Sequence, residues 1–195
     1  MNPDSLRLGG WMRPRGAVAA DSVGDNDGTL HGGPLWQPEG GRTGGALLLD
    51  GIDGHILTPF ILNPAKGPFS VFLWVKGGAP GQVILSQVGG ANWLRAASAS
   101  GCLQTEFNEP GRNAAKHLSS PVVITEGAWH RVGLVWDGTD RALYVDDVEV
   151  ARSTLTGLPD SINGLYLGAG STLAPGTFWS GLIDDVRIYD RAAKP

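Results

Sequence analysis

The chain closes on a strand-like stretch, residues 178–189, whose sequence is FWSGLIDDVRIY. Its aromatic and branched residues favour a β-strand, whereas aspartate is depleted in strands. A carboxylate near a core is costly unless it is hydrogen-bonded, paired with a cation or bound to a metal. The stretch therefore predicts a strand in which Asp184 and Asp185 have defined partners.

The rest of the chain repeats this pattern of short strands. The clearest segments, residues 68–76, 129–136 and 142–145, are rich in aromatic and branched residues and end at turns. No stretch has the apolar spacing of an amphipathic helix. Because 30 glycines and 13 prolines supply turns throughout, we predict an all-β sandwich of two antiparallel sheets. A chain of 195 residues suits a single domain over residues 1–195.

Composition and charge exclude several kinds of partner. The net charge is -4 and the 15 basic residues are scattered, so we expect no nucleic acid as a partner. No apolar run is long enough to span a membrane, and we expect no membrane insertion. The single cysteine, Cys102, excludes an intramolecular disulfide. No signal peptide is visible at the start of this sequence.

Six segments together resemble the laminin-G-like, concanavalin-A-like lectin/glucanase superfamily. They follow one another in the order 20–30, 44–53, 69–75, 129–132, 144–147 and 181–192. The resemblance covers nearly the whole chain. It implies a jelly-roll sandwich, often with a calcium ion, in proteins that bind glycans, cell surfaces or other proteins. We therefore expect a location outside the cell or on a virion surface.

The first acidic loop, residues 21–28, offers the oxygen ligands that calcium prefers. The resemblance implies that this loop lies near the last strand, so one ion would join the two chain ends. We predict a structural calcium ion with the ligands Asp21, Asp25, Asn26, Gly28 and Asp184. Two arrangements without metal stay open. In one, the loop is a set of Asx turns. In the other, Asp184 accepts hydrogen bonds from N–H groups of residues 25–29.

Asp185 has a separate predicted role. Successive side chains of a strand point to opposite faces of a sheet, so we expect Asp185 to face away from Asp184. Pairing with Arg187 or another basic residue is the simplest way to satisfy its carboxylate. Two aspartates that point apart do not form the facing pair of carboxylates that glycosidases use.

The seven tryptophans are the candidates for stacking on sugar rings. Trp74, Trp129 and Trp136 lie in apolar strands, where we expect them in the core. Trp93 follows a glycine-rich turn, and we predict that it is exposed. The ligand-binding residues that we predict, at a shallow polar groove, are Trp93, Arg95, Glu106, Asn108, Arg112 and Asn113. The alternative is an ordinary solvated loop.

Catalytic motifs are absent from the sequence. No glutamate begins the Glu-x-Asp-x-x-Glu pattern of the superfamily's hydrolases, and no Gly-x-Ser-x-Gly nucleophile motif occurs. We predict a non-catalytic carbohydrate-binding or adhesion module, whose partner is a glycan or cell-surface polysaccharide. The first alternative is a structural or assembly protein, such as a phage virion surface or tail component, that binds protein. The second is a glycan hydrolase or lyase.

Overall fold

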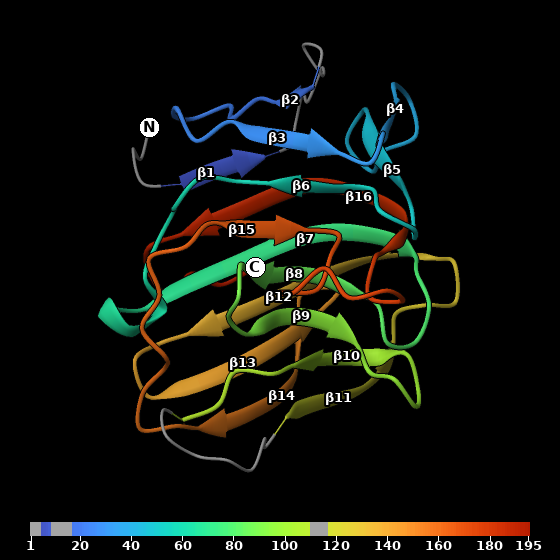
Figure 1. Ribbon diagram of the computed structural model, residues 1–195. Helices are drawn as coiled ribbons and strands as arrows, with labels where there is room; N and C mark the ends of the chain where they lie inside the picture. The colour runs from blue at the N-terminus through green and yellow to red at the C-terminus, as the bar shows by residue number, and fades with distance from the viewer. Residues whose placement is uncertain (1–4, 9–16, 110–116) are drawn as a thin grey trace.

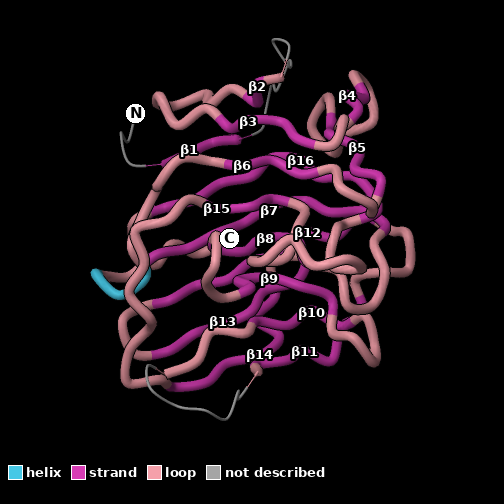
Figure 2. Tube along the Cα trace, in the orientation of Figure 1, coloured by secondary structure: helices cyan, strands magenta, loops and turns pink. Residues whose placement is uncertain are grey.

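The structure is a computed structural model that describes residues 5–8, 17–109 and 117–195. Arg112 and Asn113 of the predicted groove lie outside these ranges. Two antiparallel sheets stack face to face, with loops at both ends of the strands (Figure 1, Figure 2). One short 3-10 helix, η1 (Pro64–Lys66), is the helical element of the described residues. The prediction of an all-β sandwich is confirmed.

Sheet A contains the strand that carries Asp184 and Asp185. Its order is β14 (Val148–Thr154), β13 (Asp140–Val145), β12 (Trp129–Trp136), β7 (Phe69–Gly77), β16 (Ser180–Tyr189), β5 (Ala46–Asp50) and β4 (Leu35–Gln37), and β1 (Ser5–Leu8) also pairs with β16. Strand β16 lies between β5 and β7, near the middle of the sheet (Figure 1).

Sheet B packs against sheet A. Its order is β11 (Leu118–Val123), β10 (Cys102–Thr105), β9 (Asn92–Ala96), β8 (Val83–Gln87), β15 (Leu165–Leu167), β6 (His55–Leu57), β3 (Gly28–His31) and β2 (Val18–Ala19). None of the helices in the described ranges is long and apolar enough to cross a membrane.

The core lies between the two sheets. Alternate residues of β7, namely Val71, Leu73 and Val75, are fully buried in it. The residues between them, among them Phe72 and Trp74, lie on the outer face of sheet A because side chains alternate along a strand. The core thus fills the space between the sheets, and ligands are left with the outer faces and the loop ends.

A β-bulge interrupts the alternation in β16. Asp184 lies opposite Trp74 and Arg187 lies opposite Phe72, so three steps along β16 match two along β7. Asp185 has a positive φ of 46° inside this bulge. The expectation that Asp185 faces away from Asp184 by strict alternation therefore does not hold. Its predicted ion pair with Arg187 is confirmed, with an N–O distance of 2.6 Å.

Candidate functional site

A hollow of about 380 Å³ opens at one end of the sandwich, where the turn at residues 88–91 meets the loop at residues 158–164. Its described lining residues are Gln87, Gly89, Gly90, Ala91, Phe107, Pro159, Asp160, Ser161, Ile162 and Asn163. Phe107 is almost fully buried, whereas Ile162 is 76% exposed. The hollow therefore combines apolar side chains with polar groups, as small-molecule sites commonly do.

Asn63 fixes one wall of the hollow. Its side-chain oxygen accepts hydrogen bonds from the backbone N–H groups of Ala65 (3.1 Å) and Ser161 (3.3 Å). Its amide nitrogen donates to Asp160 Oδ1 at 3.0 Å, and Lys66 Nζ lies 3.9 Å from Asp160 Oδ2. The carboxylate of Asp160 is thus held in place by η1 and the residue before it.

Asn163 ties the same loop to the opposite wall. Its Nδ2 donates to the backbone oxygen of Val88 at 3.0 Å, and Gln87 Nε2 donates to the backbone oxygen of Asn163 at 3.2 Å. These bonds join the loop to the end of β8. They leave the side-chain oxygen of Asn163 and the carboxylate of Asp160 as acceptors for hydroxyl groups.

The predicted polar groove is formed in part. Arg95 of β9 forms an ion pair with Glu106, which directly follows β10. Asn92 Nδ2 donates to Glu106 at 2.6 Å, and Asn108 donates to the backbone oxygen of Glu106 at 2.8 Å. The structure therefore brings three of the predicted ligand-binding residues, Arg95, Glu106 and Asn108, together. Their ion pair and hydrogen bonds are made with one another, so these side chains form a network that supports β9 and β10.

The prediction that Trp93 is exposed is wrong. Its side chain is 0% exposed and packs with Phe69 and Phe107, with ring centroids 4.9 and 5.3 Å away. The glycine-rich turn before it ends at Ala91, and β9 has already begun at Trp93, where the side chain points inward. The sequence interpretation also missed the loop at residues 158–164. An isolated apolar residue, Ile162, among turn-forming residues was the signal for it.

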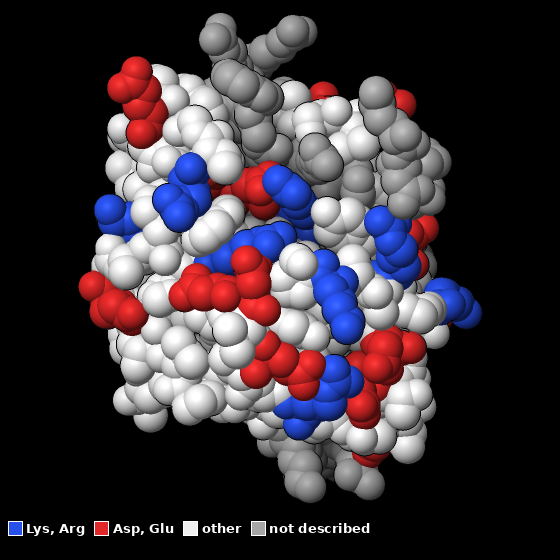
Figure 3. Space-filling model, turned by 180° about the vertical axis from the view of Figure 1, so that it is seen from behind, with Lys and Arg blue, Asp and Glu red and all other residues white. Residues whose placement is uncertain are grey.

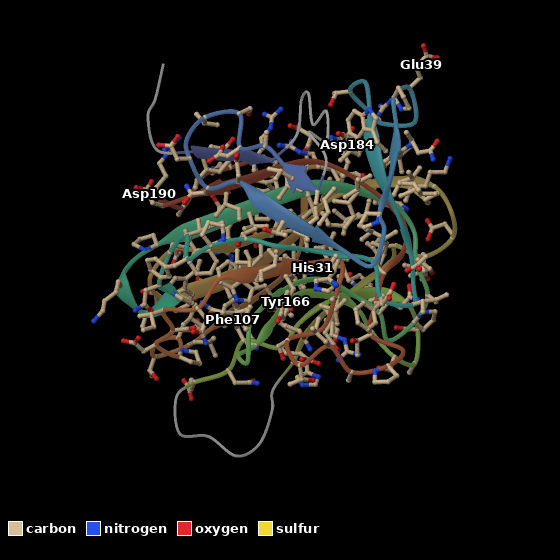
Figure 4. The ribbon with its side chains drawn as sticks, turned by 45° about the horizontal axis from the view of Figure 1, so that its top comes forward. His31, Glu39, Phe107, Tyr166, Asp184 and Asp190 are labelled. Atoms are coloured by element: carbon tan, nitrogen blue, oxygen red, sulfur yellow. The ribbon has the colours of Figure 1, made fainter. Side chains whose placement is uncertain are left out.

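A row of aromatic rings crosses the outer face of sheet B. His31 stacks on His55 at 5.0 Å, and Tyr166 meets His55 edge-on at 5.3 Å. Burial lowers the pKa of His55, and electrostatic repulsion between His55 and the nearby His31 ring is a smaller cause, although the hydrogen bond from Nδ1 to Asp53 O opposes the shift. His55 is therefore neutral near pH 7. Figure 4 shows His31 and Tyr166 near each other on this side of the molecule.

The acidic loop that suggested calcium satisfies its own carboxylates. Asp21 accepts hydrogen bonds from the backbone N–H groups of Val23 (2.9 Å) and Asn26 (3.2 Å), and Asp27 accepts one from Asp21 N at 2.7 Å. Within the described ranges, no group of three or more His, Cys, Asp or Glu side chains has the arrangement of a metal site. The bond from Val23 N to Asp21 has the spacing of an Asx turn, as in the interpretation of this loop without metal.

Asp184 is held by a different loop from the predicted one. Its side chain accepts hydrogen bonds from the backbone N–H groups of Arg42 (2.7 Å) and Thr43 (3.0 Å). The residue is 1% exposed, and Figure 4 shows it beneath the loop that joins β4 to β5. Asp21 and Asp184 therefore share no hydrogen-bond partner, and the predicted set of five calcium ligands is not brought together.

The chain belongs to the concanavalin A-like lectin/glucanases superfamily, whose laminin G family model matches residues 50–195. No curated protein sequence matches it. Solved structures share its fold at low sequence identity. The binding domain of Paraclostridial Mosquitocidal Protein 1 has 13% identity and a TM-score of 0.76, over 98% of this chain and 50% of that one.

Two further solved structures have the same fold. Domain 4 of AbnA, an extracellular GH43 arabinanase from Geobacillus stearothermophilus solved with arabinotriose, has 20% identity and a TM-score of 0.69, over 98% of this chain and 96% of that domain. A Trypanosoma rangeli sialidase has 18% identity and a TM-score of 0.70, over 98% of this chain and 30% of that one. This chain thus spans about half of the mosquitocidal binding domain and a third of the sialidase.

Proposed function

We propose that this domain binds carbohydrate without catalysis and that the hollow at residues 87–91 and 158–164 is its binding site. The observation that carries the proposal is a hollow of about 380 Å³ with mixed polar and apolar lining at the loop end of a lectin-like sandwich. Domain 4 of the arabinanase, a structure of almost the same extent, was solved with arabinotriose, which supports a sugar as the ligand.

The chemistry of the lining suits a sugar. The carboxylate of Asp160 and the side-chain oxygen of Asn163 would accept hydrogen bonds from hydroxyl groups, and Ile162 would cover the apolar face of a ring. No atom lies within 4 Å of the position where a side chain on Gly89 would begin, and its φ of 65° favours glycine. The turn therefore leaves room for a ligand at this wall.

The same lining argues against glycoside hydrolysis at this place. Glycosidases use two carboxylic acids on either side of the bond that breaks. Asp160 is the sole acidic residue among the described residues that line the hollow. A binding role needs one well-placed acceptor, whereas hydrolysis needs a second acid.

The test is a glycan array followed by calorimetry with the best ligand. We expect Asp160→Ala to weaken binding about tenfold or more, because a hydrogen bond to a charged group contributes about 1.5–3 kcal/mol. Asn163→Ala should weaken it less, because a hydrogen bond to a neutral amide contributes about 0.5–1.5 kcal/mol. Asp25→Ala is the matched control, because Asp25 is an exposed acid in another loop, and it should leave the affinity unchanged. A blank array, or full affinity in Asp160→Ala, would favour the alternative role in assembly with a protein partner.

Two further properties stay proposals. We propose an extracellular location, which the extracellular arabinanase with a similar domain supports. We also keep the sequence-based proposal of a structural calcium ion, whose ligands would come from the loop at residues 21–28 alone, because Asp184 is held by the backbone of Arg42 and Thr43.

A further inference from the structure

The outer face of sheet A, the side away from sheet B, carries a different set of side chains from the hollow. Trp74 and Trp129 were expected in the core, but both are half-buried on this outer face. Lys76 lies directly opposite Trp129, and Arg131 lies directly opposite Trp74. Aromatic and basic side chains therefore alternate here across neighbouring strands, and Figure 3 shows many basic and acidic side chains on this side of the molecule.

Asp184 explains how one of these cations is placed. By accepting the backbone N–H groups of Arg42 and Thr43, its buried carboxylate holds the loop between β4 and β5 against sheet A. The guanidinium carbon of Arg42 lies 5.1 Å from the centroid of the Trp74 ring, within the range of a cation–π contact. The charge of Arg42 is thus fixed over the aromatic surface and stays exposed to solvent.

Ion pairing separates the cations of this face into two groups. Arg131 is paired with Asp147 at 2.5 Å and Arg187 with Asp185 at 2.6 Å. In contrast, Arg42 and Lys76 are exposed, and within the described ranges neither has a carboxylate at ion-pair distance. Two positive charges beside two tryptophans are therefore available to a ligand.

We propose that Arg42, Trp74, Lys76 and Trp129, named here the Trp74 face, bind a sugar residue that carries a negative charge, either a carboxylate or a sulfate. The charge would pair with Arg42 and Lys76, and the apolar side of the sugar ring would lie on exposed parts of the indole rings. The sugar nature of the ligand rests on the proposed function. The location and the charge rest on the Trp74 face itself.

The experiment compares three oligosaccharides of equal length by calorimetry: a neutral one, one built of uronic acids and one that is sulfated. The wild-type protein should bind an acidic oligosaccharide at the Trp74 face, and an increase in salt should weaken that binding, because exposed charges are screened. The acidic oligomer that binds more tightly identifies the anionic group. Equal binding of all three would overturn the proposal.

Variants locate the binding site. Arg42→Ala with Lys76→Ala should weaken acidic binding by up to about thirtyfold, because the two exposed charge contacts are lost together. Lys194→Ala removes another exposed cation, one outside both proposed sites, and should have no effect on acidic binding. Unchanged acidic binding in the double variant, or loss of it in Asp160→Ala, would overturn the proposal.

The outcome also separates this inference from the proposed function. Acidic binding that needs Arg42 and Lys76, with no neutral sugar bound in the hollow, would support the Trp74 face and reject the hollow. Binding of a neutral sugar that needs Asp160, without binding of an acidic sugar, would support the hollow and reject the Trp74 face. An unchanged melting temperature of the double variant shows that the fold is intact, because both side chains are exposed.

Discussion

The two acidic regions of this chain, the loop at residues 21–27 and the Asp184 region of β16, use their carboxylates in different ways. Asp21 is partly exposed and accepts hydrogen bonds from residues two and five positions away. Asp184 is almost fully buried and accepts them from a loop more than 140 residues away. The first carboxylate shapes its own loop, whereas the second joins distant parts of the fold.

This difference shows that the contribution of a hydrogen bond to stability depends on whether it is buried or exposed. Water can replace the partner of an exposed N–H group, but it reaches a buried site poorly, and a lost partner there costs more. Residues that look alike in the sequence should therefore differ in their effect on stability. Variants of Asp184, His130 and Asp21 test this difference.

Asp184→Ala should have the largest effect. It removes a charged acceptor from two backbone N–H groups, and we expect a loss of about 2 kcal/mol in the free energy of unfolding. For a domain of this size the melting temperature should fall by about 4–8 °C. Asp184→Asn is the matched control: it keeps one acceptor oxygen and should lose less. An equal loss in both variants would show that the charge is essential to this contact.

His130 provides an intermediate case, because its partners are half-exposed. Its Nδ1 lies 2.9 Å from Asp146 and its Nε2 lies 2.8 Å from Glu126. Burial alone lowers the pKa of His130, but these hydrogen bonds and charges outweigh it and raise the pKa above 6.5. The stabilisation is therefore complete below pH 6.5 and is lost as the pH rises through the raised pKa.

Melting curves at pH 6 to 9 measure this effect. The melting temperature should fall by a few degrees over this range in the wild type, and the fall should be smaller in His130→Gln. The lowered pKa of His55 has the opposite effect on the free energy of unfolding. The protein loses stability as the pH falls below 6.5, because this histidine binds a proton more readily in the unfolded chain. If the wild type and His130→Gln show the same pH dependence of the melting temperature, His130 is not its source.

Asp21→Ala should have a smaller effect than Asp184→Ala. Its hydrogen bonds lie in an exposed loop, so we expect a loss of about 0.5–1 kcal/mol and a fall of about 1–3 °C in the melting temperature. Thermal melting of the two alanine variants side by side checks the comparison directly. A loss as large as that of Asp184→Ala would mean that the loop has a role beyond its own turns.

Removal of calcium should have the smallest effect. An ion held by the loop at residues 21–28 alone would sit in an exposed site, and we expect a chelator to lower the melting temperature by about 1–2 °C. Asp21→Ala should show no further change with the chelator. An unchanged melting temperature of the wild type, together with no ion in elemental analysis, would reject the proposal of calcium.

Much of the fold was predictable from the sequence, whereas the site was not. The predicted strand at residues 129–136 has the same bounds as β12, and the strand at 68–76 differs from β7 by one residue at each end. Strand patterns are local, so they can be read without knowledge of the pairing. Trp93 was misplaced because a glycine-rich turn beside a tryptophan does not reveal which way the side chain points in the following strand.

The sandwich, its family and the need of Asp184 and Asp185 for partners follow from the sequence. Which groups are those partners is seen only in the folded protein. Arg42 and Thr43, which donate hydrogen bonds to Asp184, are distant from it in sequence. The bulge in β16 breaks the alternation of side chains from which the direction of the Asp185 side chain was predicted. The hollow likewise forms where separate loops meet. Local patterns determine strands, but contacts between distant segments exist only once the chain has folded, and they determine the site.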